Sequence, residues 1–152
     1  MFRKVAVAVD GSAHAVAAVR LAAEVAKAHG AKLVIMHVMR HLGSDRIPAG
    51  LEELEHMEHV RVSEADMLRA VADEVISAAR DAATTAGVSV VETVIEDGDP
   101  ASRIIAYCTD NGVDLVVLSR RGLGTFTGML VGSVSQKVAN AAPCPCLLTP
   151  VA

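Results

Sequence analysis

The chain has 152 residues, enough for a single domain with a substantial buried core, and carries a formal net charge of −4. That acidity argues against broad electrostatic attraction to nucleic acid or to an anionic membrane, so any anion has to be held locally. Hydrophobic residues make up 52% and aromatic residues only 2%. The predicted core is therefore aliphatic, as in a parallel sheet covered by helices, and we expect one domain over residues 1–152.

The first predicted strand, Lys4–Val9, follows two basic residues, so the start of the chain superficially resembles a signal peptide. Asp10 interrupts the apolar stretch and a helical pattern follows, which argues against secretion. No uncharged apolar run reaches the roughly 18–20 residues that span a bilayer. The cysteines, Cys108, Cys144 and Cys146, are odd in number and sparse, as is typical of a reducing compartment. We therefore expect a cytoplasmic protein.

Asp10 stands between the first strand and a helix predicted from the N-cap Ser12 to His29, just before Gly30. A carboxylate at the end of a strand can accept hydrogen bonds from ribose hydroxyls or reach a metal ion on a phosphate. The alternative is a turn residue that caps the first helix, and spacing alone slightly favours this alternative.

The second predicted strand runs from Leu33 to about Val38 and includes His37, which we interpret as a satisfied core histidine. The irregular segment His41–Val60 follows as an insertion, and its acidic part is predicted to form a short helix. His56 and His59 lie beside three glutamates there, which invites a metal site. With no third ligand in view, a solvated helix face is the preferred interpretation.

The remaining elements alternate regularly between helix and strand. They are a helix from about Ser63 to Ala86 ended by Gly87, a strand at Val88–Ile95, a helix opening at Asp99–Pro100 and ending before Gly112, a strand at Asp114–Ser119, a helix from about Gly132 to Ala141 and a strand at Cys146–Thr149. This alternation predicts right-handed crossovers and a doubly wound α/β fold, with a mostly parallel five-stranded sheet and helices on both faces.

The loop after the fourth strand carries the strongest binding signal. Four glycines fall within eleven residues: Gly122, Gly124, Gly128 and Gly132. Glycines let backbone N–H groups approach a ligand closely, and the helix that follows offers the unpaired N–H groups that favour phosphate. Ser133 and Ser135 add hydroxyls, and Arg120 and Arg121 add positive charge. A flexible glycine loop with Ser133 as a simple N-cap is the equally weighted alternative.

Other ligand and catalytic patterns are missing. The sequence contains no G-x-x-x-x-G-K-[ST] phosphate loop, and the loop after the first strand is no G-x-G-x-x-G fingerprint. No Ser/His/Asp or Cys/His arrangement can be argued from the sequence either. P-loop NTPases and Rossmann dehydrogenases are thereby excluded.

Taken together, these motifs resemble the universal stress protein (UspA-like) family over nearly the whole chain, from Lys4 to Pro150. The resemblance rests on V-A-V-D-G-S, I-M-H-V, E-D-G-D-P-A, D-L-V-V-L-S-R-R-G, V-G-S-V-S and A-P-C-P-C-L-L in this order. It implies an adenine nucleotide alpha hydrolase-like fold with strand order 3-2-1-4-5. In the ATP-binding branch a glycine, two residues, a second glycine and nine residues precede Gly-Ser. Gly122 and Gly132–Ser133 match this spacing, whereas Ser119 replaces the first glycine.

The resemblance also implies the ligand contacts. Phosphates are expected against Gly122, Gly132, Ser133, Val134 and Ser135, with Arg121 in reach of a phosphate. Adenosine is expected between Ala8, Val9 and Asp10 on one side and the backbone of Val38 on the other, with Leu118 and Ser119 completing the set. A left-handed backbone at Ser119 would cost roughly 1 kcal/mol.

The function predicted on this basis is binding of an adenine nucleotide by a regulatory or stress-response factor, without enzymatic activity. ATP, with or without Mg²⁺, ranks ahead of AMP and cyclic AMP. One alternative is an interaction module with a degenerate site that regulates a partner such as a transporter. Another is slow ATP hydrolysis or autophosphorylation, with Asp10 and a metal near the phosphates and Ser133 or Ser135 as the phosphate acceptor. The resemblance further implies a homodimer through the C-terminal edge strand, Cys144–Pro150, with no nucleic acid partner and no membrane insertion.

Overall fold

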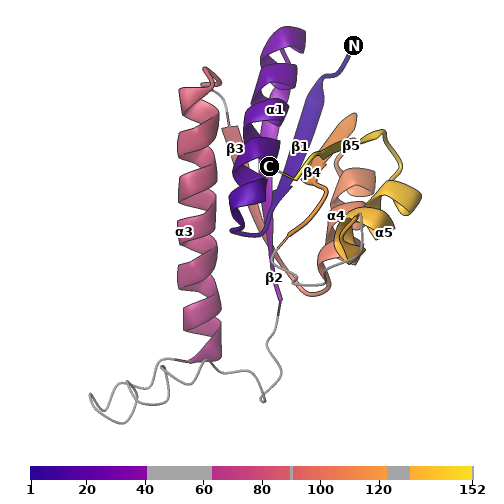
Figure 1. Ribbon diagram of the computed structural model, residues 1–152. Coiled ribbons are helices and arrows are strands. Elements are labelled where there is room, and N and C mark those ends of the chain that lie inside the picture. The colour runs from indigo at the N-terminus through magenta and orange to yellow at the C-terminus, as the bar shows by residue number, and fades with distance from the viewer. Residues whose placement is uncertain (41–62, 90, 123–130, 152) are drawn as a thin grey trace.

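Five parallel strands form one sheet in the order β3-β2-β1-β4-β5, as expected (Figure 1). The computed structural model describes residues 1–40, 63–89, 91–122 and 131–151. The strands are β1 (Lys4–Val9), β2 (Lys32–Met39), β3 (Val91–Asp97), β4 (Leu115–Ser119) and β5 (Cys146–Thr149). The helices in these ranges are α1 (Ala13–His29), α3 (Glu64–Thr85), α4 (Pro100–Asp110) and α5 (Ser133–Ala141).

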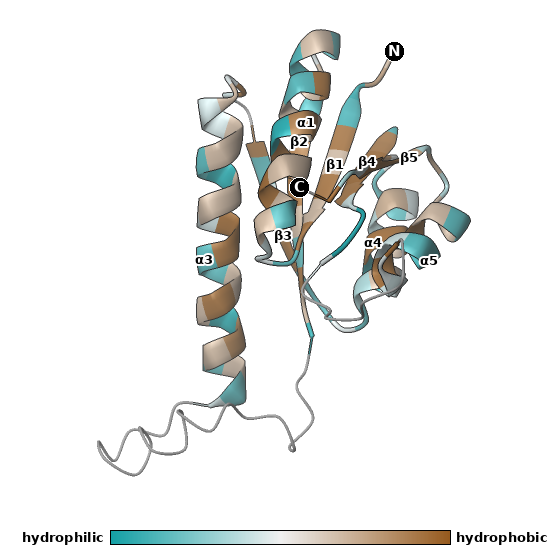
Figure 2. Ribbon diagram, viewed as in Figure 1, coloured by the Kyte–Doolittle hydropathy of each residue, from teal (hydrophilic) through white to brown (hydrophobic). Residues whose placement is uncertain are grey.

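Helices cover both faces of the sheet, which confirms the doubly wound prediction. In Figure 1, α1 and α3 lie on one side of the strands and α4 and α5 on the other. Two aliphatic clusters fill the spaces between the layers, one with Val5, Val7 and Leu33 toward α1 and α3, the other with Val34 and Val116 toward α4 and α5. The central strands are accordingly brown along most of their length in Figure 2, while α3 alternates between apolar and polar faces.

Local signals in the sequence placed most helix ends correctly. Ser12, Ser63 and Asp99 each accept a hydrogen bond from the backbone N–H three residues later, at 3.3, 3.1 and 3.0 Å. Gly30 and Gly87 follow the ends of α1 and α3 with φ of 64° and 88°, a conformation that favours glycine.

The predicted start of the third strand was wrong. Val88 lies in the turn after α3, where its N–H donates to Ala83 O at 3.2 Å while Gly87 N–H donates to Thr84 O at 2.9 Å. These two bonds are the closing pattern of a helix whose next apolar residue packs back onto it. Val88 is buried in that role, and β3 begins at Val91.

The two central strands separate at their carboxyl ends. β1 stays paired with β2 as far as Val9 and His37, but its pairing with β4 ends at Val7 and Val117. β4 itself continues to Ser119 alongside β5. This is the point where the strand order reverses, and ligands of open parallel sheets bind in such a crevice.

Within the described ranges, no helix is both long enough and apolar enough to cross a membrane. The insertion His41–Val60, with His56 and His59, lies outside the described residues, as do Gly124 and Gly128.

Candidate functional site

Asp10 lies in the crevice where β1 and β4 separate, and its carboxylate bridges two loops. Asp10 Oδ1 accepts a hydrogen bond from Ser12 N at 2.9 Å, so the residue closes the turn that leads into α1. The helix cap is Ser12 rather than Asp10, which corrects the alternative considered for this residue. The other carboxylate oxygen lies against the backbone of Gly122.

Gly122 has no room for a side chain. A Cβ at this position would overlap Asp10 Oδ2 and lie 3.3 Å from Asp10 Cγ. The close approach of the carboxylate therefore requires glycine here, and it joins the end of β1 to the loop that follows β4. Asp10 and Gly122, both named among the expected contact residues, therefore lie side by side.

Gly132 joins the start of α5 to the same loop. Its N–H donates to Arg120 O at 2.7 Å. A Cβ built on Gly132 would lie 3.4 Å from Arg120 O and 3.9 Å from Gly122 N, which is ordinary van der Waals contact. The beginning of α5 is therefore packed on the backbone of Arg120, Arg121 and Gly122, which follow β4, although residues 123–130 separate them in sequence.

The N-terminus of α5 has no side-chain cap. Gly132, with φ −65° and ψ 155°, is the N-cap, and its lack of a side chain leaves the first N–H groups without that acceptor. The first helical bond here runs from Gln136 N to Gly132 O at 2.9 Å. The N–H groups of Ser133, Val134 and Ser135 precede it, and such groups bind anions. The interpretation of Ser133 as a simple N-cap is thus wrong, because Ser133 is the first helical residue and is exposed.

The hydroxyls of Ser119 and Ser135 are used inside the protein. Ser135 Oγ donates to Ser119 O at 2.7 Å, and Ser119 Oγ donates to Arg121 O at 2.6 Å. Both serines are buried, at 8% and 6% exposure. Ser119 is the last residue of β4, paired with Thr149 in extended backbone, so the conditional cost of a left-handed conformation does not arise.

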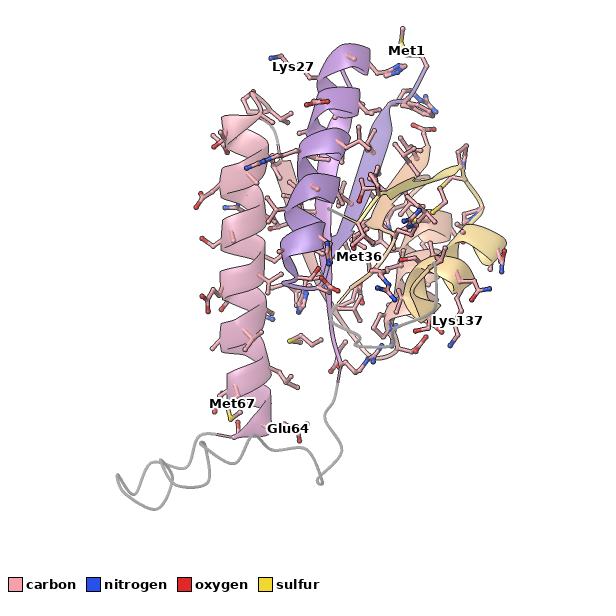
Figure 3. The ribbon with its side chains drawn as sticks, in the orientation of Figure 1. Met1, Lys27, Met36, Glu64, Met67 and Lys137 are labelled. Carbon is pink, nitrogen blue, oxygen red and sulfur yellow. The ribbon has the colours of Figure 1, made fainter. Side chains whose placement is uncertain are left out.

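The other predicted contact residues fall into two groups. Ala8, Val38 and Val134 are half-buried and pack against the cluster on the α4 and α5 side of the sheet. Val9 and Leu118 are buried, at 6% and 4% exposure, so their backbones rather than their side chains are available to a ligand. Arg121 is half-buried directly before Gly122. Figure 3 shows the side chains, with Met36 marking β2 and Lys137 marking α5.

His37 belongs to the site's framework, which sequence reasoning did not anticipate. The prediction of a satisfied core histidine in the second strand is confirmed, since the residue is 8% exposed and Nδ1 lies 2.8 Å from Val9 O. What the sequence did not predict is its hydrogen bond to Val9, the residue just before Asp10. The only signal for it in the sequence was a histidine in an otherwise apolar strand.

Two further features delimit the site. A cavity of about 370 Å³ lies between α1 and α3, lined by Val9, Asp10 and Gly11 and by aliphatic residues of both helices, including Val71 and Val75. It lies on the opposite face of the sheet from α5. Among the residues with a described placement, no group of three or more His, Cys, Asp or Glu side chains is arranged to hold a metal ion.

Comparison with known proteins identifies the family. The sequence profile of the Universal stress protein family matches residues 1–150. A universal stress protein of Thermus aquaticus, from the 3′ region of the QAH/OAS sulfhydrylase gene, is 34% identical, with 97% of this chain and 98% of that protein covered.

Solved structures agree with the sequence comparison. The universal stress protein UspA from Lactobacillus plantarum is 26% identical with a TM-score of 0.76, and 97% of each chain is covered. A universal stress protein in complex with cAMP is also 26% identical, with a TM-score of 0.72 and 99% of each chain covered. On these grounds the chain belongs to the universal stress protein family.

Proposed function

We propose that the protein binds an adenine nucleotide in the crevice between β1 and β4 and acts as a regulatory or stress-response factor. ATP is the first candidate and AMP and cyclic AMP are the next. The observation that carries this proposal is the packing of Asp10 on Gly122 and of Gly132 on the same loop. It places a carboxylate and an uncapped helix N-terminus at one end of the sheet.

The Asp10 carboxylate and the N-terminus of α5 are chemically complementary to different parts of a nucleotide. The N–H groups at the start of α5, which no N-cap side chain accepts, and the partial positive charge of the helix N-terminus stabilise phosphate. Arg121 adds a positive charge beside Gly122 in a chain whose net charge is −4. Asp10 offers carboxylate oxygens to ribose hydroxyls, and the backbone near Val38 borders the space assigned to adenosine. Mg²⁺ enters the proposal only as a companion of the phosphates.

The comparisons support the ligand class. The related universal stress protein solved with cAMP has the same fold at 26% identity over nearly the whole chain. Ser119, the departure from the ATP-binding pattern, lies in ordinary strand backbone and its hydroxyl stays within the loop. Both observations favour a working site over a degenerate one.

The test begins with protein purified without added nucleotide. Denaturing it and separating the released small molecules by chromatography identifies any nucleotide that it carries. Calorimetric titration with ATP, AMP and cyclic AMP, each with and without Mg²⁺, then ranks the ligands. No released nucleotide together with flat titrations would overturn the proposal and favour an interaction module.

The proposal includes no enzymatic turnover. Ser135, one of the two serines considered as phosphate acceptors, is buried with its hydroxyl bonded to Ser119 O. Incubation with radiolabelled ATP tests this point. Phosphate release or protein labelling that wild type shows and Asp10→Ala loses would make the protein a slow enzyme, whereas a signal equal in both would indicate a contaminant.

We also propose that two copies pair through β5. This strand is an edge of the sheet, pairs only with β4 within the described chain, and has a proline on either side, Pro145 and Pro150. Cys146, Leu147 and Leu148 remain half-buried in the single copy, and exposed strand edges favour pairing. Sedimentation equilibrium measures the mass, and a monomer at tens of micromolar would contradict the proposal.

A further inference from the structure

A hydrogen bond to the end of β1 holds His37, which lies near the carboxyl end of β2. Its Nδ1 lies 2.8 Å from the carbonyl oxygen of Val9, and the residue is 8% exposed. A carbonyl oxygen can only accept, so Nδ1 carries the proton in this contact. The ring is thereby fixed in one orientation across the β1–β2 pair, where Val9 and His37 are register partners.

The carbonyl that His37 binds lies where β1 loses its other neighbour. The pairing of β1 with β4 ends at Val7 and Val117, two residues earlier. Val9, the last residue of β1, therefore lies in a part of the strand that is still paired with β2 but no longer with β4. Val9 is itself 6% exposed, and the Nδ1–H of His37 donates to its carbonyl in addition to the ladder pairing of β1 with β2.

Asp10 follows Val9 directly, so the orientation of the Val9 carbonyl sets the direction in which the chain leaves β1. The space available to the Asp10 carboxylate is narrow, because one oxygen accepts from Ser12 N at 2.9 Å and the other lies against Gly122. A rotation of the Val9–Asp10 peptide would move the carboxylate out of this fit.

We propose that His37 is a positioning residue of the nucleotide site, holding the Val9 carbonyl so that the Asp10 carboxylate stays against Gly122. This inference rests on the proposed function and assigns His37 no contact with the nucleotide. Without the Nδ1–H donor, the end of β1 samples orientations that do not bind. The apparent dissociation constant then rises in inverse proportion to the fraction that remains competent.

Two variants separate the hydrogen bond from the bulk of the ring. His37→Leu keeps an apolar side chain in a buried position but removes the donor. His37→Asn places an amide nitrogen the same number of bonds from Cα as Nδ1, so it can still donate to Val9 O. We expect His37→Leu to weaken adenine nucleotide binding about tenfold, as for a competent fraction of about one tenth, and His37→Asn to stay within about threefold of wild type.

The measurements are calorimetric affinities for ATP well below the unfolding midpoint, with cooperative unfolding of each variant checked by circular dichroism. A merely structural role would lower the midpoint without changing the affinity of the folded protein. If His37→Leu does not fold, His37→Gln replaces it, since its amide nitrogen reaches the Nε2 position instead and is expected to weaken binding similarly.

A readout without nucleotide tests the basis of the proposal. Nitrogen NMR of the imidazole is expected to show His37 protonated at Nδ1, and a ring protonated only at Nε2 would overturn the inference. Wild-type binding with an unchanged affinity in His37→Leu overturns this role alone. Wild type that binds no nucleotide removes the proposed function and this inference together.

Discussion

The N-termini of α4 and α5 differ in whether a side chain caps the first N–H groups of the helix. Both helices follow strands of the sheet and lie on the same face. α4 begins behind Asp99, whose carboxylate accepts from Ser102 N at 3.0 Å and Ser102 Oγ at 2.7 Å, with Pro100 in the first turn. α5 begins behind Gly132, which has no side chain to offer.

The difference is chemical. At α4 the Asp99 carboxylate accepts a hydrogen bond from an N–H of the first turn and offsets the partial positive charge of the helix N-terminus. At α5 no side chain caps the first N–H groups, and the start of the helix packs on Gly122, which lies against Asp10. An N-cap glycine is only a few tenths of a kcal/mol less favourable than a polar cap, so an open end costs little stability.

Gly132→Asp would make α5 resemble α4, and it is expected to have the largest effect. The backbone at Gly132 is already that of an N-cap, and a Cβ there meets only ordinary contacts. The new carboxylate would occupy the N–H groups and repel phosphate, so we expect ATP affinity to fall at least about tenfold, from about 1.4 kcal/mol or more of repulsion. Stability should rise by a few tenths of a kcal/mol.

Gly132→Asn is the matched control, because it caps the helix without a charge. Calorimetric titration of both variants separates occupation of the N–H groups from repulsion. An ATP affinity of Gly132→Asp equal to that of wild type would show that phosphate does not bind at α5.

Gly122→Ala tests the contact between Asp10, which follows β1, and Gly122, in the loop after β4. Its Cβ would force the Asp10 carboxylate away and weaken the bond to Ser12 N, so we expect ATP affinity to fall about tenfold and the free energy of unfolding by about 1 kcal/mol.

Gly112→Ala controls for the loss of a glycine. It is strained by its φ of 59° but meets no atom within 4 Å. Urea unfolding should show a loss of about 1 kcal/mol with unchanged affinity. Equal affinities in the two alanine variants would contradict a role for the Asp10–Gly122 contact in binding.

Asp99→Ala removes the side chain that caps the N-terminus of α4. It should lower the free energy of unfolding by about 1 kcal/mol and leave nucleotide affinity unchanged, because none of the residues proposed to bind the nucleotide belongs to α4. The Ser102 hydroxyl and N–H lower the pKa of Asp99. Its stabilisation is therefore present above the carboxyl pKa of the unfolded chain and is lost as pH falls through the lower folded pKa.

Denaturant unfolding of wild type and Asp99→Ala at several pH values checks the sign. The difference between the two proteins should shrink below about pH 4. A difference that grows on acidification would mean that the cap does not act through the ionised carboxylate.

Ser119→Gly is expected to have the smallest effect. Because Ser119 is a paired strand residue whose hydroxyl donates to Arg121 O at 2.6 Å, glycine gains nothing from conformational freedom and loses one local bond. We expect ATP affinity to stay within about threefold of wild type. A large gain from a near-zero starting affinity would instead identify a degenerate site in the natural protein.

Much of the fold could be predicted because its signals are local. Ser12 and Asp99 begin helices through bonds to N–H groups three residues away, and Gly30 ends one with a positive φ. The aliphatic strands reflect burial on both faces. Val88 was misplaced because an apolar residue just after a helix has the same composition as the first residue of a strand.

For the site, the sequence by itself determined the parts, namely a carboxylate after the first strand and spaced glycines before the last helix. Only the tertiary structure decided that Gly122 leaves room for Asp10, that Ser135 donates its hydroxyl to Ser119 O, and that His37 holds the Val9 carbonyl. Capping and chain reversal depend on neighbours within a few residues, whereas these contacts join positions 16 to 112 residues apart, and which distant groups meet is set by strand order and register.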